Sequence, residues 1–295
     1  MRVLNSGPVE LDAGNALQLS QHLQSLILAV KSDCMSEDGS RVDYAHAASS
    51  PTFADFSAGC RSLQTVEVEQ LGSEAERRCF FINLYNALTV YGLCTLSPLP
   101  SSPQAVRDFW DTTALQIGRW CLTLNDLEHG ILRGNGAHPA GRAPHWPPGD
   151  ERVSLSLPLE PRIHFALNCG ARSCPPIRVF TPANLEVGLA AAAAGFLERE
   201  TEVTADSVTL SSLMLWYAAD FGDTQEAVLA RIAGYMPEGS SKRTALLRLL
   251  QTAGQLPPAA ALYNATAGRL LPTLMKWGAV HVRFAPYDWS LNNAT

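Results

Sequence analysis

The sequence predicts an α+β fold that is mainly helical, forms a single domain and contains one small antiparallel sheet. Segments with a helical spacing of apolar residues dominate the chain, strand-like segments are few and widely separated, and neither a repeat nor a low-complexity linker is present. Of the 295 residues, 46% are hydrophobic and 17% are charged. Because this composition offers enough apolar surface for a folded core, disorder is excluded for most of the chain.

The apolar spacing also predicts individual elements. Helices are expected at residues 14–31, 74–96, 126–133, 182–200, 224–235, 240–253 and 264–277, strands at 118–124 and 280–284, and a hairpin at 203–210. Asn125 or Asp126 is expected to cap the short helix at 126–133. Ser73 and Glu76 form a capping box before the second helix. Residues 134–161 are rich in Gly and Pro and predict a long functional loop. We interpret residues 1–40 as an N-terminal helical extension and residues 41–295 as the domain.

The longest apolar run, CFFINLYNALTVYGLCTL, covers residues 79–96. Asn83 and Asn86 lie in its middle, and two unpaired amides would be costly in lipid. We therefore expect a helix buried in the protein core, and no membrane span. Since the two residues are three positions apart, they share one helix face. Their amides either bond to main-chain groups or face a substrate pocket.

Charge and cysteine content limit the compartment and the partners. With 22 basic and 28 acidic residues, the net charge of −6 argues against a nucleic-acid-binding protein. The N-terminal residues lack an apolar stretch of signal-peptide length, so a cytoplasmic location is expected. Seven scattered cysteines, an odd number, do not resemble a secreted disulfide framework.

The densest group of reactive residues lies in RIHFALNCGARSCPPIRVF, residues 162–180. His164, Cys169 and Cys174 follow one another at five-residue spacing, with Arg172 nearby. A guanidinium group favours the thiolate, which is both the nucleophile and the metal ligand. Three functional interpretations stay open: a cysteine nucleophile activated by histidine, a zinc site, and a dithiol–disulfide pair. A purely structural interpretation, with two buried thiols and a core histidine, stays open beside them.

A second polar group lies in LNDLEHGILR, residues 124–133. Helical spacing places Glu128 on the apolar stripe, where a carboxylate must be paired, protonated or adjacent to a cavity. His129 precedes Arg133 by one helical turn. Glu128 therefore either forms a structural ion pair or, with His129, completes a site with the cysteines.

Five blocks of sequence together resemble the family called domain of unknown function 547. The blocks are FFINLYNALT, LNDLEHGILRGN, EPRIHFALNCGARSCPPIRVFTPANL, VTLSSLMLWYAADFG and FAPYDWSLN. The resemblance runs from about residue 42 to residue 292 and leaves the first forty residues outside. The positions of the family pattern are all present in this chain; they are Asn83, Asn86, Glu128, His129, Arg133, His164, Cys169, Cys174, Tyr287 and Asp288. Some members carry the domain beside glutaredoxin-like modules, which suggests thiol chemistry only by association.

Our leading hypothesis is a cysteine-dependent enzyme for acyl transfer, or for hydrolysis of an amide or thioester in a small-molecule or peptide substrate. The residues expected to be catalytic are Cys174, Cys169, His164, Glu128 and His129. Those expected to bind substrate are Asn83, Asn86, Arg133 and Arg172. No cofactor is assigned, and zinc enters only if the chain is a metal-binding protein. A thiol redox protein and a non-catalytic interaction or scaffold module are the two further hypotheses that the residues leave open.

Overall fold

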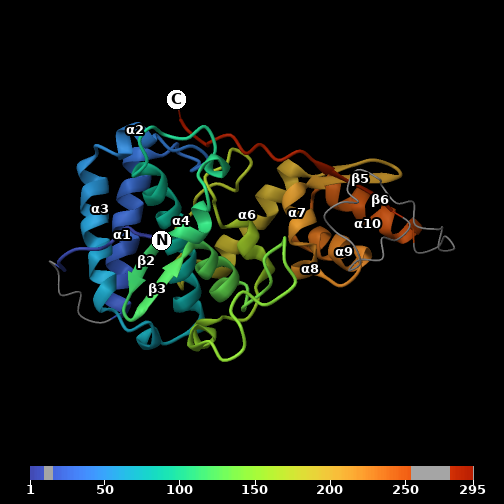
Figure 1. Ribbon diagram of the computed structural model, residues 1–295. Coiled ribbons are helices and arrows are strands. Elements are labelled where there is room, and N and C mark those ends of the chain that lie inside the picture. The colour runs from blue at the N-terminus through green and yellow to red at the C-terminus, as the bar shows by residue number, and fades with distance from the viewer. Residues whose placement is uncertain (10–15, 254–279, 295) are drawn as a thin grey trace. The chain divides into compact units, whose positions relative to one another are not determined.

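Helices and short strands build two units in the computed structural model, which describes residues 1–9, 16–253 and 280–294 (Figure 1). The first unit comprises Met1–His138, Ala143–Leu189 and Asp288–Thr295. The second comprises Pro139–Arg142 and Ala190–Tyr287. Helix α6 (Leu185–Glu200) continues from the first unit into the second without a break.

The first unit contains all the elements that precede α6 in the chain. They are β1 (Arg2–Val3), α1 (Ala16–Cys34), α2 (Tyr44–Ala47), α3 (Pro51–Arg61), η1 (Ser62–Thr65), η2 (Val68–Gln70), α4 (Glu74–Cys94), η3 (Pro103–Ala105), α5 (Phe109–Thr112), β2 (Thr113–Ile117), β3 (Trp120–Thr123), η4 (Asp126–Leu132), η5 (Glu151–Leu155) and η6 (Pro161–Phe165). Of these, η4 is a π-helix and the other η elements are 3₁₀-helices.

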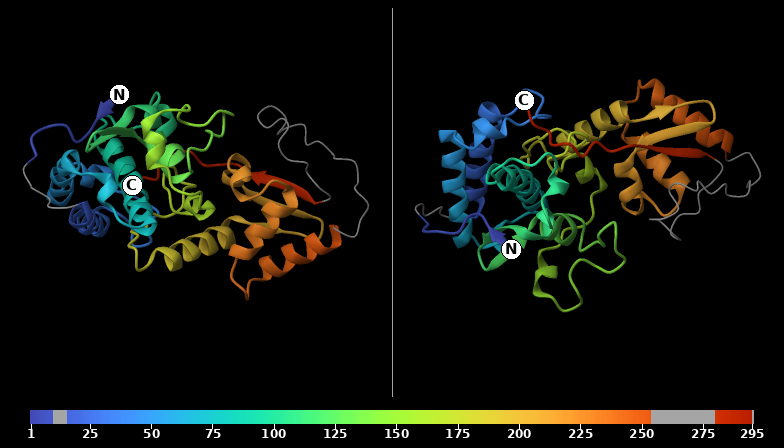
Figure 2. Two further views of the ribbon diagram at one scale, coloured as in Figure 1. Left: turned by 90° about the horizontal axis from the view of Figure 1, so that it is seen from below. Right: turned by 45° about the horizontal axis from the view of Figure 1, so that its top comes forward.

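Helix α4 is the core of the first unit. Its N-terminus carries the expected capping box, in which Ser73 and Glu76 each bond to the main chain of the other. Every residue from Arg78 to Leu93 is buried, because α1, α2, β2 and η4 all pack against this helix. Figure 2 shows α1 and α3 side by side in blue on one flank. No helix in the described ranges is both long and apolar enough to cross a membrane.

A three-stranded sheet in the order β1–β2–β3 covers part of this core. Strands β2 and β3 form an antiparallel hairpin in which Ile117 pairs with Trp120. Gly118 opens the turn with a φ of 52°, and its N–H donates to the Leu63 carbonyl at 2.7 Å. Strand β1 adds to β2 in parallel, with Arg2 opposite Thr113.

The second unit has a sheet of its own, in the order β4–β5–β6. Its elements after α6 are β4 (Glu202–Val203), β5 (Ser207–Ser211), α7 (Ser212–Trp216), α8 (Ala218–Phe221), α9 (Gln225–Tyr235), α10 (Ser241–Ala253) and β6 (His281–Ala285). Strands β4 and β5 form the expected antiparallel hairpin, and β6 pairs with β5 in parallel. The helix expected at 264–277 lies outside the described residues.

The prediction of a mainly helical α+β fold is confirmed. The described residues contain two mixed sheets rather than one antiparallel sheet. The hairpins are local, whereas β1 and β6 join their neighbours from distant parts of the chain, and a local sequence pattern carries no signal of such pairing. The single domain at residues 41–295, with its boundary at residue 40, stays a prediction.

We expect Gly118→Ala to lower the free energy of unfolding by about 2–4 kcal/mol, because an L-residue is strained at this φ and overpacking adds to the cost. A Cβ atom at residue 118 would lie 2.1 Å from the Val66 carbonyl oxygen. Chemical denaturation of the two proteins measures the difference. The matched control is Gly195→Ala on α6, where a Cβ meets nothing within 4 Å and should stabilise the helix by about 0.5–1 kcal/mol. Equal effects at both sites would contradict the assigned turn.

Candidate functional site

The loop that carries the two predicted reactive cysteines is attached to the buried face of α4. Asn86 donates from its side chain to the Ala166 carbonyl at 2.9 Å and accepts from the Asn168 N–H at 2.8 Å. Asn83 forms the same pair of bonds with the carbonyl and the N–H of Phe180, at 2.7 and 2.9 Å. Both amides therefore bond to main chain, which was one of the two roles expected for them.

The C-terminal segment holds the same loop from its other side. The Arg172 N–H donates to the Ser290 carbonyl at 2.8 Å, and the Asn292 N–H donates to the Gly170 carbonyl at 2.9 Å. Ala171 and Leu291 form an antiparallel bridge between these two bonds. The block APYDWSLN thus contributes to the site region by fixing the cysteine loop within the first unit.

Cys169 and Cys174 meet within this loop. Their sulfur atoms are 2.8 Å apart, and the Cys169 N–H donates to the Cys174 sulfur at 3.2 Å. The hydrogen bond to Cys174, burial and the nearby Cys174 and Glu128 charges raise the pKa of Cys169 well above its ordinary value. Cys169 therefore keeps its proton, and its thiol is able to donate to the Cys174 sulfur. Cys174 is 6% exposed, whereas Cys169 is partly exposed.

Glu128 and His129 lie on η4, a π-helix rather than the α-helix that the apolar spacing predicted. The Arg133 N–H donates to the Glu128 carbonyl at 2.8 Å, and the Asn135 N–H donates to the Gly130 carbonyl at 2.9 Å, both five residues back. π-Helical turns are rare and frequent at functional sites. All seven residues of η4 are buried.

The buried carboxylate and imidazole on η4 have defined partners. The Tyr85 hydroxyl on α4 donates to Glu128 Oε2 at 2.8 Å. Arg133 Nη1 donates to His129 Nδ1 at 2.9 Å, so Nδ1 is an acceptor and the ring proton of the neutral imidazole is on Nε2. The His138 ring lies edge-on to that of His129, with centroids 4.9 Å apart.

Burial sets the protonation state of His129. It lowers the pKa of the imidazole to about 3; the charge of Glu128 opposes this shift, and Arg133, His138 and His145 add to it. The side chain is therefore neutral at pH 7. In this state it donates from Nε2 and is a weak base.

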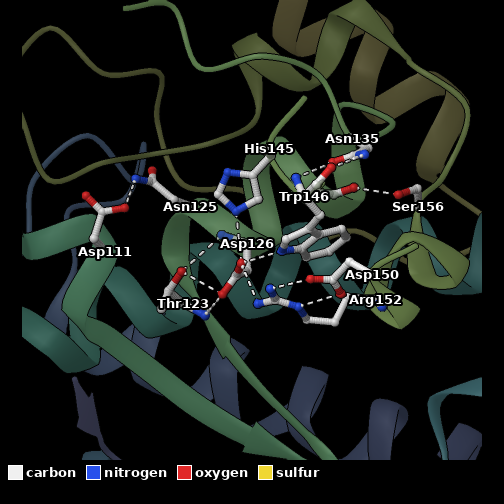
Figure 3. A network of polar contacts seen from close by, with 11 residues as sticks. Asp111, Thr123, Asn125, Asp126, Asn135, His145, Trp146, Asp150, Arg152 and Ser156 are labelled. Carbon is white, nitrogen blue, oxygen red and sulfur yellow. Dashed lines mark hydrogen bonds and ion pairs between the residues drawn. The ribbon is translucent and has the colours of Figure 1, made fainter. Parts of the chain in front are cut away.

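Asp126, also on η4, is the centre of a second polar network (Figure 3). Its Oδ1 accepts from His145 at 2.9 Å and from the Trp146 indole at 2.8 Å, while Oδ2 accepts from the N–H and hydroxyl of Thr123. Arg152 approaches Oδ1 to 3.4 Å. Burial alone would raise the pKa of Asp126, but these hydrogen bonds outweigh it and lower the pKa to about 2.

The structure brings several of the predicted residues together. Cys169 and Cys174 are in contact, Glu128 acts on the Cys169 thiol through its charge, and His129 contacts Arg133. His164 is buried on η6, and Arg172 is exposed. Across the described part of the chain, His164 and the two cysteines do not form a three-ligand group of the kind that holds a metal.

Sequence reasoning missed Asp126, His145 and Trp146. The sequence held a signal for His145 and Trp146, because they are neighbours in the loop at 134–161, which was expected to be functional. Asp126 had a weaker signal, since it was considered only as a helix cap. Tyr85, the partner of Glu128, resembles any other aromatic residue of the buried helix.

We expect Asn86→Ala to lower the free energy of unfolding by about 2–5 kcal/mol, because it leaves a buried carbonyl and a buried N–H without their partner. Urea denaturation measures this loss. Gln21→Ala, at an exposed amide on α1, is the matched control and should change stability by less than about 0.5 kcal/mol. Unchanged stability in Asn86→Ala would show that the loop is held by other contacts.

The neutral state of His129 predicts a pH dependence of stability. Between pH 6 and pH 4 the unfolded chain binds one proton at this residue that the folded chain does not, because the folded pKa of about 3 is below the ordinary 6.5. Stability is therefore lost as the pH falls, by about 1.4 kcal/mol per pH unit from this residue. Denaturation from pH 4 to 6 should show a slope smaller by that amount in His129→Gln. Identical slopes would contradict a buried neutral imidazole.

Comparison with known proteins concerns this same region. No curated protein and no solved structure matches the chain significantly. A family model described as "Protein of unknown function, DUF547" matches residues 68–197, a span that includes α4, η4 and the cysteine loop. The resemblance read from the sequence is confirmed there, while its extension to residues 42 and 292 stays a prediction. Residues 68–197 are therefore similar to the DUF547 family.

Proposed function

We propose that the first unit is a cysteine-dependent enzyme that transfers or hydrolyses acyl groups, with Cys174 as the nucleophile. One observation carries this proposal: the Cys169 N–H donates to the Cys174 sulfur, and the Cys169 sulfur lies 2.8 Å from it, where a protonated Cys169 thiol can donate as well. Hydrogen bonds donated to a thiolate stabilise it and lower the pKa of the thiol. The thiolate is the form of cysteine that attacks a carbonyl carbon.

The neighbouring charges support this division of roles. Because Glu128 helps to keep the proton on Cys169, it makes Cys169 a donor to Cys174. In the proposed reaction Cys174 transfers its proton to His164 and its sulfur bonds to the acyl carbon. The leaving amine or thiol takes that proton, and water then releases the acid from the thioester. Asn86 is a positioning residue in this scheme, since its amide is engaged with the loop.

The remaining predicted residues have narrower roles in this proposal. His129 donates a hydrogen bond from Nε2 instead of accepting the Cys174 proton, because its Nδ1 already accepts from Arg133. The exposed Arg172 attracts an anionic part of a small-molecule or peptide substrate. A cytoplasmic location, where thiols are kept reduced, is part of the same proposal.

A second candidate function rests on the 2.8 Å separation of the two sulfur atoms. Two thiols this close can form a disulfide after a small side-chain rotation. In that reaction a small external disulfide accepts two electrons, both thiols lose their protons, and the external disulfide leaves as two thiols. The chemistry would then be redox exchange rather than acyl transfer.

The first test is the rate at which iodoacetamide alkylates each cysteine of the full chain at pH 7, measured by peptide mass spectrometry. Cys174 should react fastest, and Cys169→Ala should slow it about tenfold, because one hydrogen bond to the thiolate is lost. Cys121→Ser is the matched control, since Cys121 lies on β3 away from this pair, and it should leave the Cys174 rate unchanged. A Cys174 rate no higher than that of Cys121 would overturn the proposal.

The second test separates the two candidate functions. Incubation with a small aryl thioester should leave an acyl group on Cys174 if the chain is an acyl-transfer enzyme. Incubation with glutathione disulfide should instead give an internal Cys169–Cys174 disulfide, lighter by two hydrogen atoms, if the pair is a redox couple. An internal disulfide without any acyl adduct would favour the second function over the first.

A further inference from the structure

A separate group of ligand-type side chains lies where α1 ends and α2 begins. Asp33 and Cys34 are the last two residues of α1, and His46 is in α2. One potential ligand atom from each residue lies within 4.8 Å of the other two. These residues precede the span that matches the family model.

The distances fit a tetrahedral transition-metal site. His46 Nε2 lies 3.0 Å from Asp33 Oδ1, and Cys34 Sγ lies 3.6 Å from Asp33 Oδ2. Bond lengths of 2.0–2.3 Å to zinc place tetrahedral ligand atoms roughly 3.3–3.7 Å apart. The three ligand atoms lie within 4.8 Å of one another, so adjustments of the side chains are expected to bring them to a single ion.

The main chain between the ligands is fixed. Met35 and Val42 form an antiparallel bridge, and the Asp43 N–H donates to the Cys34 carbonyl at 2.7 Å. The Asp43 side chain in turn caps α2 by accepting from the His46 N–H at 2.9 Å. Because these bonds close the connection between α1 and α2, the ligands are already positioned before an ion binds, which reduces the entropy cost of binding.

We propose that Asp33, Cys34 and His46 form a binding site for a transition-metal ion of the zinc class, with a fourth coordination position left for water or a small ligand. The donor set identifies the class of ion. Sulfur, imidazole nitrogen and carboxylate oxygen are together the ligands of zinc, whereas calcium and magnesium bind oxygen atoms. Three protein ligands with an open fourth position are typical of zinc sites that exchange ligands.

The surroundings support an accessible ion rather than a sealed structural one. The His46 side chain is 48% exposed and that of Asp33 is 34% exposed. The hydroxyl of Ser50 bonds to Asp33 Oδ2, and Ser50 also lines an open cavity of about 380 Å³. The carboxylate thus lies next to a space that a small ligand can enter.

Cobalt(II) tests the site directly, because a thiolate bound to cobalt has a charge-transfer absorption. We expect the metal-free full chain, in a non-thiol reductant, to develop this absorption up to one equivalent and to lose it when zinc is added. Cys34→Ser should abolish it. His46→Ala should weaken cobalt binding by roughly 100-fold or more, since even changes behind the ligands cost 10–100-fold.

Matched controls replace the same residue types elsewhere. Cys121→Ser and His22→Ala, the latter at an exposed position of α1, should bind cobalt as the unmodified chain does. Cys174→Ser should do so as well, which keeps this proposal separate from the proposed enzyme. His46 is half exposed, so His46→Ala is expected to fold, and circular dichroism checks each variant. The absence of a thiolate absorption, or its persistence in Cys34→Ser, would overturn the proposal.

Discussion

The pair of hydrogen bonds that Asn86 makes across the core is the contact on which the site depends. A helix buried on all sides has no solvent-exposed face, so its few polar groups must find partners inside the protein. Asn86 bonds to both a carbonyl and an N–H of the cysteine loop, and Asn83 repeats the arrangement farther along. A loop of irregular backbone can lie against an apolar helix only because these amides replace water for its main chain.

The same helix explains how charge is tolerated in the interior. Tyr85 lies on α4 between the two asparagines and donates to Glu128, which is buried on η4. Burial lowers the pKa of the neighbouring His129 until it is neutral, so η4 does not hold two opposite charges that would both need desolvation. Arg133, four residues after His129, reaches its Nδ1 across one turn of this helix.

The sequence predicted those parts of the structure whose cause is local. The capping box, the buried helix and the pairing of polar positions along it follow from residues a few positions apart, and each is present. The π-helix was not predictable, because the sequence of residues 126–132 fits an α-helix as well. His145 and Asp126, which bond to each other, are 19 residues apart in the sequence. No periodic pattern of residues predicts a contact over such a separation. The contact between Cys169 and Cys174 was predictable only from the family resemblance and from the short separation of the two residues in the sequence.

The seven cysteines differ through their surroundings and not through their number. Burial raises the pKa of the Cys94 thiol to about 12, and burial together with the charge of Asp33 raises that of Cys34 to about 11. Such thiols are inert as nucleophiles, although a metal ion can replace the proton of Cys34. Cys174 is also buried, yet the Cys169 N–H donates to its sulfur and the Cys169 sulfur lies 2.8 Å away. Since burial and donors act in opposite directions on a thiol, these two groups around Cys174 are the basis on which we propose it as the reactive cysteine.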